Sequence, residues 1–255
     1  MPDFSKFRID ARPPQRQIGD GSAPRDAPPR SIQGIVRRYA GPKSSARCLV
    51  LFDATGSMQP YWNHLCGTLH SMVDRLLSVH PHLLLKIVAY RDDCDGSRVI
   101  VGSEWTRSAA VLGEFVGKCR CEGGGDWPEA VDRALAVALG EQDALSAVVL
   151  IGDAPPHAER NGRDEARRLG ALKRPVFPIV VGGAGDTRAA FDEIARLSGG
   201  KRLDLERLEE LFDVLAAILA YAGGADVMAE YVAKYDRLLT PGGRSAVRML
   251  TDGGK

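Results

Sequence analysis

The chain has 255 residues, and its composition already excludes several classes of protein. Hydrophobic residues make up 44% and charged residues 26% of the sequence, as in an ordinary soluble globular protein. The formal net charge of +1 gives no support for nucleic-acid binding, and no apolar run approaches the roughly 20 residues that cross a bilayer. The first residues contain no apolar stretch typical of a secretory signal. Five cysteines, an odd count in a large domain, favour reduced thiols, so we expect a cytoplasmic protein.

The first 45 residues differ in composition from the rest of the chain. Seven of the 15 prolines lie there, and through Arg47 the segment carries ten lysines and arginines against four aspartates. Low hydrophobicity with many prolines and charges predicts a disordered tail over residues 1–45. The tail is either a solvated leader or a docking peptide for an acidic partner or for the acidic remainder of the chain. We expect a folded domain at 46–222 and a C-terminal helical extension at 223–255.

From Arg47 onward, short apolar runs alternate with amphipathic helical patterns. The strands that we expect are Arg47–Asp53, Leu83–Tyr90, Arg98–Val101, Leu145–Gly152, Val176–Val181 and Lys201–Leu205. The expected helices are Gln59–Val79, Ser108–Lys118, Glu129–Leu139, Arg163–Leu172, Thr187–Leu197, Glu206–Leu219 and Asp226–Leu239, the last of which should end at Pro241-Gly242-Gly243. This alternation predicts an α/β fold, doubly wound, with a mostly parallel sheet between helices.

The first of these strands ends in a cluster of oxygen-bearing side chains. The apolar run Leu49-Val50-Leu51-Phe52 is typical of a buried parallel strand, and Asp53, Thr55 and Ser57 follow it. Open α/β sheets bind their ligands at the carboxyl ends of the strands, where this loop should lie. One carboxylate and two hydroxyls are hard ligands, so we predict a site for Mg²⁺, with Mn²⁺ or Ca²⁺ as alternatives.

Two further acidic loops follow strands that could lie beside the first one. One is the loop Gly123-Gly124-Gly125-Asp126-Trp127-Pro128-Glu129, and the other is Asp153 after Ile151-Gly152. Loops at the carboxyl ends of neighbouring strands meet in one crevice. The candidate metal ligands are therefore Asp53, Thr55, Ser57, Asp126, Glu129 and Asp153, with the choice between Asp126 and Glu129 left open.

At these residues the chain resembles the von Willebrand factor type A (VWA) domain and its metal-ion-dependent adhesion site (MIDAS). The segment from Asp53 to Ser57 is similar to the DxSxS element of the family, with threonine in place of the first serine, and Asp153 matches the late metal-site aspartate. The middle loop departs from the common pattern because it lacks the usual threonine. It is similar to the Asp-x-Pro-Glu segment of integrin β-subunit domains. The resemblance covers about residues 46–220.

The resemblance implies a Rossmann-like, six-stranded sheet of strand order 3-2-1-4-5-6 with the third strand antiparallel. It also implies Mg²⁺-dependent protein binding without catalysis, through an aspartate or glutamate that the partner presents to the metal. With this variant of the middle loop, the chain resembles intracellular bacterial members of the VWA family, which often work beside AAA+ ATPases, kinases or phosphatases. We therefore expect a protein partner, no nucleic acid and no membrane.

A class of enzymes, a nucleotide-binding domain and the roles of several single residues stay as alternatives. Mg²⁺-dependent phosphohydrolases with an aspartate nucleophile also begin with an apolar strand, but Thr55 stands where their second aspartate belongs. A nucleotide-binding domain would need a Walker motif, which is absent.

Three residues near the predicted site each have two possible roles. Arg91 could pair with an incoming carboxylate or with Asp92. His157 could line the site or be exposed, and Trp127 could be a recognition aromatic or a packing residue.

Overall fold

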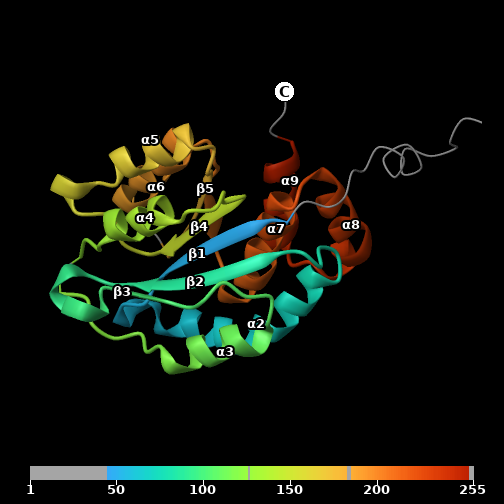
Figure 1. Cartoon of the computed structure of the whole chain (residues 1–255), viewed down its shortest axis with the longest axis horizontal. Coiled ribbons are helices and arrows are strands. Elements are labelled where there is room, and N and C mark those ends of the chain that lie inside the picture. Colours follow the sequence, from blue (N-terminus) through green and yellow to red (C-terminus); the bar gives the residue numbers. More distant parts are fainter. Residues whose placement is uncertain (1–44, 126, 183–184, 253–255) are drawn as a thin grey trace, which may run out of the picture. The chain divides into compact units, whose positions relative to one another are not determined.

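The strands form one six-stranded sheet of order β3-β2-β1-β4-β5-β6, in which β3 is antiparallel and all the others are parallel. The computed structural model describes residues 45–125, 127–182 and 185–252. The strands are β1 (Arg47–Asp53), β2 (Leu84–Tyr90), β3 (Ile100–Gly102), β4 (Ala147–Gly152), β5 (Val176–Val181) and β6 (Leu203–Leu205). The fold class, strand order and direction expected from the sequence are therefore confirmed (Figure 1).

The central strand β1 separates two layers of helices. Cys48, Val50 and Phe52 point into the core shared with α2 (Gln59–Leu77), α3 (Ala109–Lys118) and α7 (Leu211–Ala222). Leu49 and Leu51 point into the other core, against α4 (Val131–Gly140), α5 (Arg163–Ala171) and α6 (Gly185–Ser198). Figure 1 shows α4, α5 and α6 gathered on one side of the sheet and α2 and α3 on the other. Within the described residues, none of the helices combines the length and the hydropathy needed to cross a membrane.

The chain after α7 continues as two helices, α8 (Ala225–Tyr235) and α9 (Pro241–Thr251). As expected, α8 packs on the domain, and its residues Val227, Met228 and Tyr231 are buried. The predicted helix Asp226–Leu239 does end before Pro241, but Pro241 begins a further helix, α9, which the sequence analysis did not predict. Proline suits the first position of a helix, where its missing N–H costs nothing.

The two glycines at the start of α9 let it approach α7 closely. A Cβ atom on Gly242 would lie 2.6 Å from the carboxylate carbon of Glu210, and one on Gly243 would lie 2.5 Å from Cβ of Asp213. Glu210 Oε1 accepts a hydrogen bond from Gly242 N at 3.1 Å, and Asp213 Oδ2 accepts one from Thr240 N at 2.6 Å. Pro-Gly-Gly is therefore the sequence of a tightly packed helix start, although its residues are typical of a turn.

Two other boundaries differ from the sequence prediction in ways that shape the candidate site. The predicted strand Arg98–Val101 is shifted, because residues 93–98 form a 3-10 turn (η2, Asp93–Arg98) before β3. The predicted helix Glu129–Leu139 begins two residues later, at Val131. Glu129 lies in extended backbone instead, and its N–H donates to Pro155 O at 2.9 Å.

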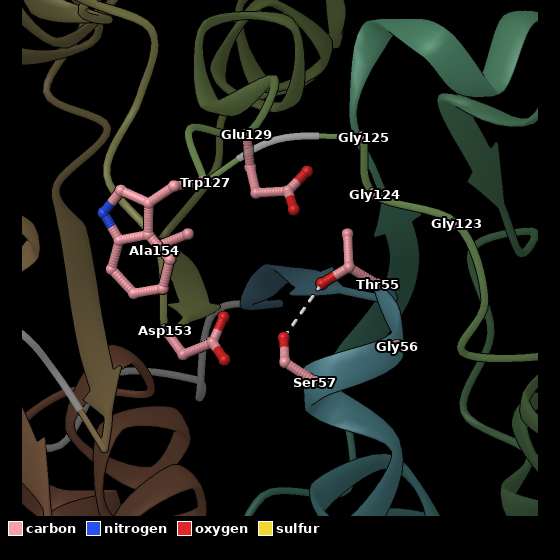
Figure 2. Close-up of a pocket in the computed structure, with 10 residues that line it drawn as sticks. All are labelled: Thr55, Gly56, Ser57, Gly123, Gly124, Gly125, Trp127, Glu129, Asp153 and Ala154. Atoms are coloured by element: carbon pink, nitrogen blue, oxygen red, sulfur yellow. Dashed lines mark hydrogen bonds between the residues drawn. The ribbon is translucent and has the colours of Figure 1, made fainter.

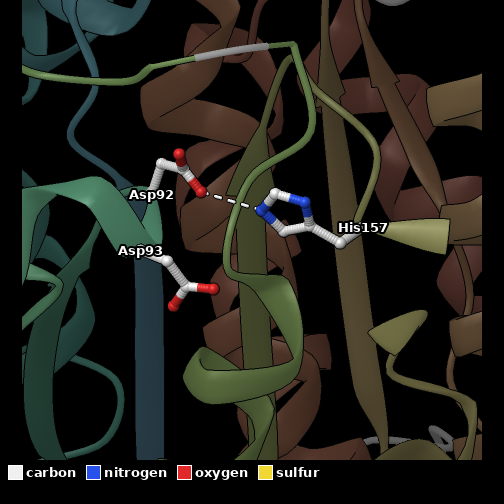
Figure 3. Close-up of side chains that lie close together, drawn as sticks. All are labelled: Asp92, Asp93 and His157. Atoms are coloured by element: carbon white, nitrogen blue, oxygen red, sulfur yellow. Dashed lines mark hydrogen bonds and ion pairs between the residues drawn. The ribbon is translucent and has the colours of Figure 1, made fainter. Parts of the chain in front are cut away.

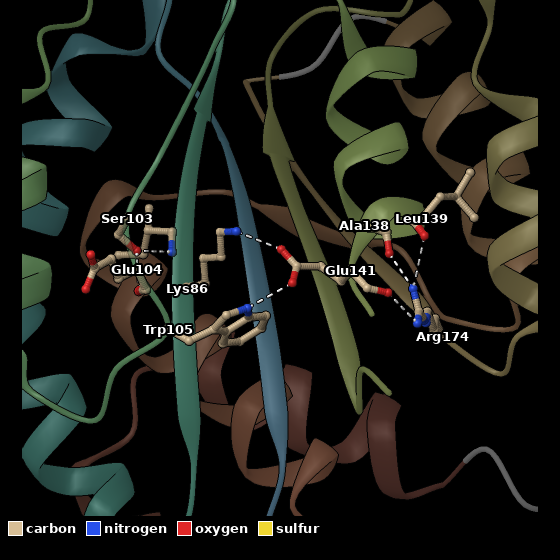
Figure 4. Close-up of polar contacts among 9 residues, drawn as sticks. Lys86, Ser103, Glu104, Trp105, Ala138, Leu139, Glu141 and Arg174 are labelled. Atoms are coloured by element: carbon tan, nitrogen blue, oxygen red, sulfur yellow. Dashed lines mark hydrogen bonds and ion pairs between the residues drawn. The ribbon is translucent and has the colours of Figure 1, made fainter. Parts of the chain in front are cut away.

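At the edge where the parallel strands begin, the buried ionic groups have partners. Arg174, just before β5, is 7% exposed and donates to Ala138 O at 2.7 Å and Glu141 O at 2.8 Å, at the end of α4 (Figure 4). The side chain of Glu141 accepts from Lys86 Nζ at 2.7 Å and Trp105 Nε1 at 2.9 Å. This edge is thus held together by satisfied charges, in contrast to the opposite edge.

Candidate metal centre

Asp53 ends β1 at the carboxyl edge of the sheet and begins the candidate site. Its side chain is fully buried, and its Oδ1 atom accepts hydrogen bonds from Thr55 N at 2.9 Å and from Thr55 Oγ1 at 2.7 Å. Thr55 Oγ1 also lies 3.3 Å from Ser57 Oγ, in the short turn η1 (Gly56–Met58). Because the aspartate bonds back onto its own loop, the carboxylate and the two hydroxyls are held together.

Four of the predicted ligands line one pocket of about 250 Å³. Thr55 and Ser57 form one side, while Asp153, directly after β4, and Glu129 form the other. Figure 2 shows the carboxylates of Glu129 and Asp153 and the hydroxyls of Thr55 and Ser57 directed toward the same space. Since Asp53 is hydrogen-bonded to Thr55, the structure brings together residues from three separate segments of the chain.

The glycine loop owes its course to two residues with positive φ. Gly123 has a φ of 90° and Gly124 a φ of 82°, a region that glycine adopts at little cost. A Cβ atom on Gly124 would lie 3.2 Å from Glu129 Oε1 and 3.3 Å from Thr55 Cβ, and one on Gly123 would clash with the carboxylate of Asp95. The N–H of Gly124 donates to Asp95 Oδ2 at 3.1 Å. The two glycines therefore let the loop bring Glu129 close to Thr55.

Each of the three carboxylates has one buried oxygen that no hydrogen-bond donor of the described residues reaches. These atoms are Asp53 Oδ2, Glu129 Oε2 and Asp153 Oδ1. Burial raises the pKa of Asp53 to about 7, although the hydrogen bonds from Thr55 lower it. Burial also raises the pKa of Glu129 to about 9, and the nearby negative charges of Asp53 and Asp92 add to the effect. Crowded, buried anions are unfavourable unless a positive charge joins them.

This set of donors fits a hard divalent cation. Carboxylate and hydroxyl oxygens are the ligands that Mg²⁺, Mn²⁺ and Ca²⁺ prefer, and a cation would satisfy the oxygens that lack a donor. The donors that the structure describes are Asp53, Thr55, Ser57, Glu129 and Asp153. Asp126, the alternative to Glu129, lies outside the described residues.

The side chain of Arg91 binds backbone carbonyls, two of which lie just before the glycine loop. The side chain is buried, and it donates to Glu122 O at 3.2 Å, Arg98 O at 2.8 Å and Arg120 O at 2.6 Å. In the described part of the chain, its hydrogen bonds go to these carbonyls and to neither Asp92 nor another carboxylate. Pairing with Asp92 is therefore not seen among the described residues, and pairing with an incoming carboxylate stays a prediction.

A second polar cluster lies beside the pocket and joins His157 to two aspartates. His157 Nε2 lies 2.8 Å from Asp92 Oδ1, and ligand atoms of Asp92, Asp93 and His157 lie within 4.8 Å of one another (Figure 3). Burial works in the opposite direction, but the hydrogen bonds from His157 and from the backbone lower the pKa of Asp92. Asp93 also pairs with Arg133 at 2.7 Å and with Arg160. Two guanidinium groups thus already compensate its charge, which disfavours a metal there.

Tyr90 is a residue of the site that the sequence analysis missed. It is fully buried at the end of β2, and its hydroxyl donates to Ile151 O at 3.2 Å. A Cβ atom on Gly152 would lie 2.5 Å from Tyr90 Oη and 3.4 Å from Asp53 Oδ2. Gly152 therefore leaves room for both side chains, and a glycine just before Asp153 was the signal in the sequence.

Solved structures with this architecture come from proteins of low sequence identity. Proximal thread matrix protein 1 from the mussel byssus, solved with zinc in its MIDAS motif, has a TM-score of 0.56 and 17% identity, over 71% of this chain and 46% of that one. A von Willebrand factor type A structure from Catenulispora acidiphila gives 0.54 and 17%, over 71% and 43%. The VWA domain of SpRpn10 gives 0.52 and 11%, over 68% and 95%.

Comparison of sequences adds one relative. No protein-family model matches the chain. An ariadne-like RING finger protein, so named in Acanthamoeba polyphaga mimivirus, is 30% identical over an alignment of 181 positions, which covers 63% of this chain. The chain spans 18% of the length of that viral protein. From its strand order and its structural neighbours, the chain has the fold of a VWA domain.

Proposed function

We propose that this chain is a divalent-metal-dependent protein-interaction module and not an enzyme. The observation that carries the proposal is the group of three carboxylates with unpaired buried oxygens beside the hydroxyls of Thr55 and Ser57. A Mg²⁺-type ion held by these side chains would supply positive charge and leave a position for a carboxylate of another protein. The zinc-occupied MIDAS of the mussel protein supports a metal at this place in the fold.

The side chains at the proposed site would contribute two kinds of metal ligand, charged and neutral. Asp53, Glu129 and Asp153 supply the negative charge that a divalent ion requires, while the two hydroxyls add oxygens without charge. Because the carboxylates are buried and crowded, a cation that displaces their protons would relieve the repulsion between their negative charges. The described residues that line the pocket include no basic side chain. The ion alone would therefore attract the partner's acidic side chain.

The partner and its setting are proposals drawn from the resemblance. We propose a protein that presents aspartate or glutamate, with an AAA+ ATPase, a kinase or a phosphatase as candidates. The bacterial type and the cytoplasmic location stay predictions from the sequence. All five cysteines are free thiols in the structure.

Affinity purification with a matched pair of variants tests the proposal. Ser57→Ala removes a hydroxyl from the pocket, whereas Ser71→Ala makes the same change on an exposed position of α2. We expect a partner that wild type and Ser71→Ala retain in Mg²⁺, and that Ser57→Ala or EDTA releases. Partners retained equally in EDTA would contradict a metal-dependent module.

A phosphatase assay tests the enzyme alternative. A generic phosphate ester is incubated with Mg²⁺ and with wild type or Asp53→Asn. We expect no turnover above the buffer in either sample. Turnover that disappears in Asp53→Asn would show that the site is catalytic and would contradict a module that only binds.

A further inference from the structure

The pocket has an apolar side in addition to its oxygen donors. Trp127 lines it together with Ala154 and the backbone of the glycine loop. Trp127 is 50% exposed. The other two tryptophans differ from it, because Trp62 is only 1% exposed and Trp105 donates a hydrogen bond to Glu141. A large aromatic surface left open beside a ligand site is typical of a binding contact. Figure 2 shows the ring on the Asp153 side of the pocket, across from Thr55 and Ser57.

The indole is held in place by a chain of hydrogen bonds that leads back to the metal site. Trp127 Nε1 donates to Asp186 Oδ2 at 3.2 Å, and Asp186 Oδ1 accepts from Thr187 N at 2.9 Å. Thr187 Oγ1 then donates to the backbone oxygen of Asp153 at 3.1 Å. The ring is therefore oriented relative to Asp153 before a partner arrives, which lowers the entropy lost on binding.

The size of the pocket leaves room for more than a metal ion. Its volume is about 250 Å³, and a water molecule occupies roughly 30 Å³ in the liquid. An ion with a few waters, or with one carboxylate, fills only part of that space. The rest adjoins Trp127 and Ala154, so the residue next to the partner's acidic group meets an apolar surface.

The charges around the ring favour an apolar neighbour over a basic one. Asp186 is the acidic group to which the indole donates, and hydrogen bonds from Trp127 and from Thr187 N lower its pKa. Both of its oxygens are already bonded, one to the ring and one to the helix backbone. The carboxylate is thus committed to orienting the ring, and the exposed part of Trp127 offers apolar contact.

We propose that Trp127 determines the specificity of the site by binding an apolar side chain next to the partner's acidic residue. The recognised element is then a short acidic–hydrophobic segment, in which aspartate or glutamate is flanked by leucine or phenylalanine. This inference rests on the proposed metal-dependent function and adds the class of partner to it.

Short capped peptides test the inference in Mg²⁺ buffer, with binding followed by calorimetry. Each peptide has a central aspartate flanked by leucine, alanine or arginine, and a control has asparagine in place of the aspartate. For wild type we expect the leucine peptide to bind about tenfold more tightly than the alanine peptide, as for an aromatic hot spot. Trp127→Ala should remove this preference, and Trp127→Phe should keep part of it.

Two controls separate failure of this inference from failure of the proposed function. Leu238→Ala truncates another exposed apolar side chain, which is 67% exposed, and it should keep the preference. The Mg²⁺-induced rise in melting temperature is measured for every variant to check that the metal site has formed. Two results would overturn the role of Trp127 but not the metal-dependent function. One is a preference for the leucine peptide that survives in Trp127→Ala, and the other is tighter binding of the arginine peptide than of the leucine peptide to wild type. Equal binding of aspartate and asparagine peptides, or no binding of any aspartate peptide, would overturn the metal-dependent function itself.

Discussion

Replacing Asp53 by asparagine should stabilise the protein without metal and abolish its response to metal. The side chain is fully buried, and burial raises its pKa from an ordinary 3.8 to about 7. A difference of about three pKa units corresponds to about 4 kcal/mol, because each unit is worth about 1.36 kcal/mol. Asparagine keeps an oxygen for the hydrogen bonds from Thr55 and carries no charge. We expect Asp53→Asn to gain about 1–4 kcal/mol of unfolding free energy at pH 8 in EDTA.

The sign of the pH dependence follows from the raised pKa. Between about pH 4 and pH 7 the unfolded chain has lost the proton of Asp53, while the folded chain still holds it. The folded state therefore binds more protons, so this group lowers the stability of the metal-free protein as the pH rises. The advantage of Asp53→Asn should shrink at pH 5 to about two fifths of its value at pH 8, since only about 1.2 of the roughly 3.2 pKa units then separate the pH from the unfolded value.

Metal should offset the stability advantage of Asp53→Asn, because it stabilises mainly the wild type. A ligand at about 100 times its dissociation constant stabilises the folded state by about 2.7 kcal/mol, and Asp53→Asn should lose most of this gain. Urea unfolding at pH 5 and pH 8, in EDTA and in Mg²⁺, measures both effects.

Asp213→Asn is the matched control for this experiment. Asp213 is also buried, but Arg75 Nη1 at 2.9 Å and Thr240 N at 2.6 Å bond its carboxylate. Its replacement should destabilise the protein in both buffers and leave the gain from Mg²⁺ intact. If Asp53→Asn were less stable than wild type in EDTA at pH 8, or gained as much from Mg²⁺, the reasoning about Asp53 would be refuted.

Two further predictions concern Glu129 and the opposite edge of the sheet. The affinity for Mg²⁺ should rise between about pH 7 and pH 9, because the pKa of Glu129 is raised to about 9 and the metal must displace the proton of this carboxyl group. Calorimetric titrations at several pH values measure this rise, and Glu129→Gln should flatten it. Arg174→Met should cost about 2–4 kcal/mol of unfolding free energy, because buried carbonyls lose charged donors, while the melting-temperature gain from Mg²⁺ stays unchanged.

The fold was predictable because its signals are local. The run from Leu49 to Phe52 is buried on both sides, and that burial requires apolar residues at every position of β1. The segment from Asp53 to Ser57 and the loop before Glu129 were recognisable because their residue types and order are those of a known motif. The structure places Thr55, Ser57, Glu129 and Asp153 around one pocket.

What the sequence did not reveal depends on residues far apart in the chain. The bond between Trp127 and Asp186 and that between His157 and Asp92 join residues separated by 59 and 65 positions. Helix α9 was missed because its Pro-Gly-Gly start is explained only by the close approach of acidic side chains from before and within α7. Local propensity for a turn was there overridden by tertiary packing.

The two edges of the sheet treat buried charge in opposite ways, and the contrast is itself an argument for function. Where the parallel strands begin, Arg174 and Glu141 are paired or hydrogen-bonded. Where they end, Asp53, Glu129 and Asp153 each keep a buried oxygen without a donor among the described residues. An unsatisfied buried polar group costs about 1–3 kcal/mol, and a whole domain is stable by only about 5–15 kcal/mol. Three such groups at one point therefore support the proposal of a ligand there, since a divalent cation would compensate all three at once.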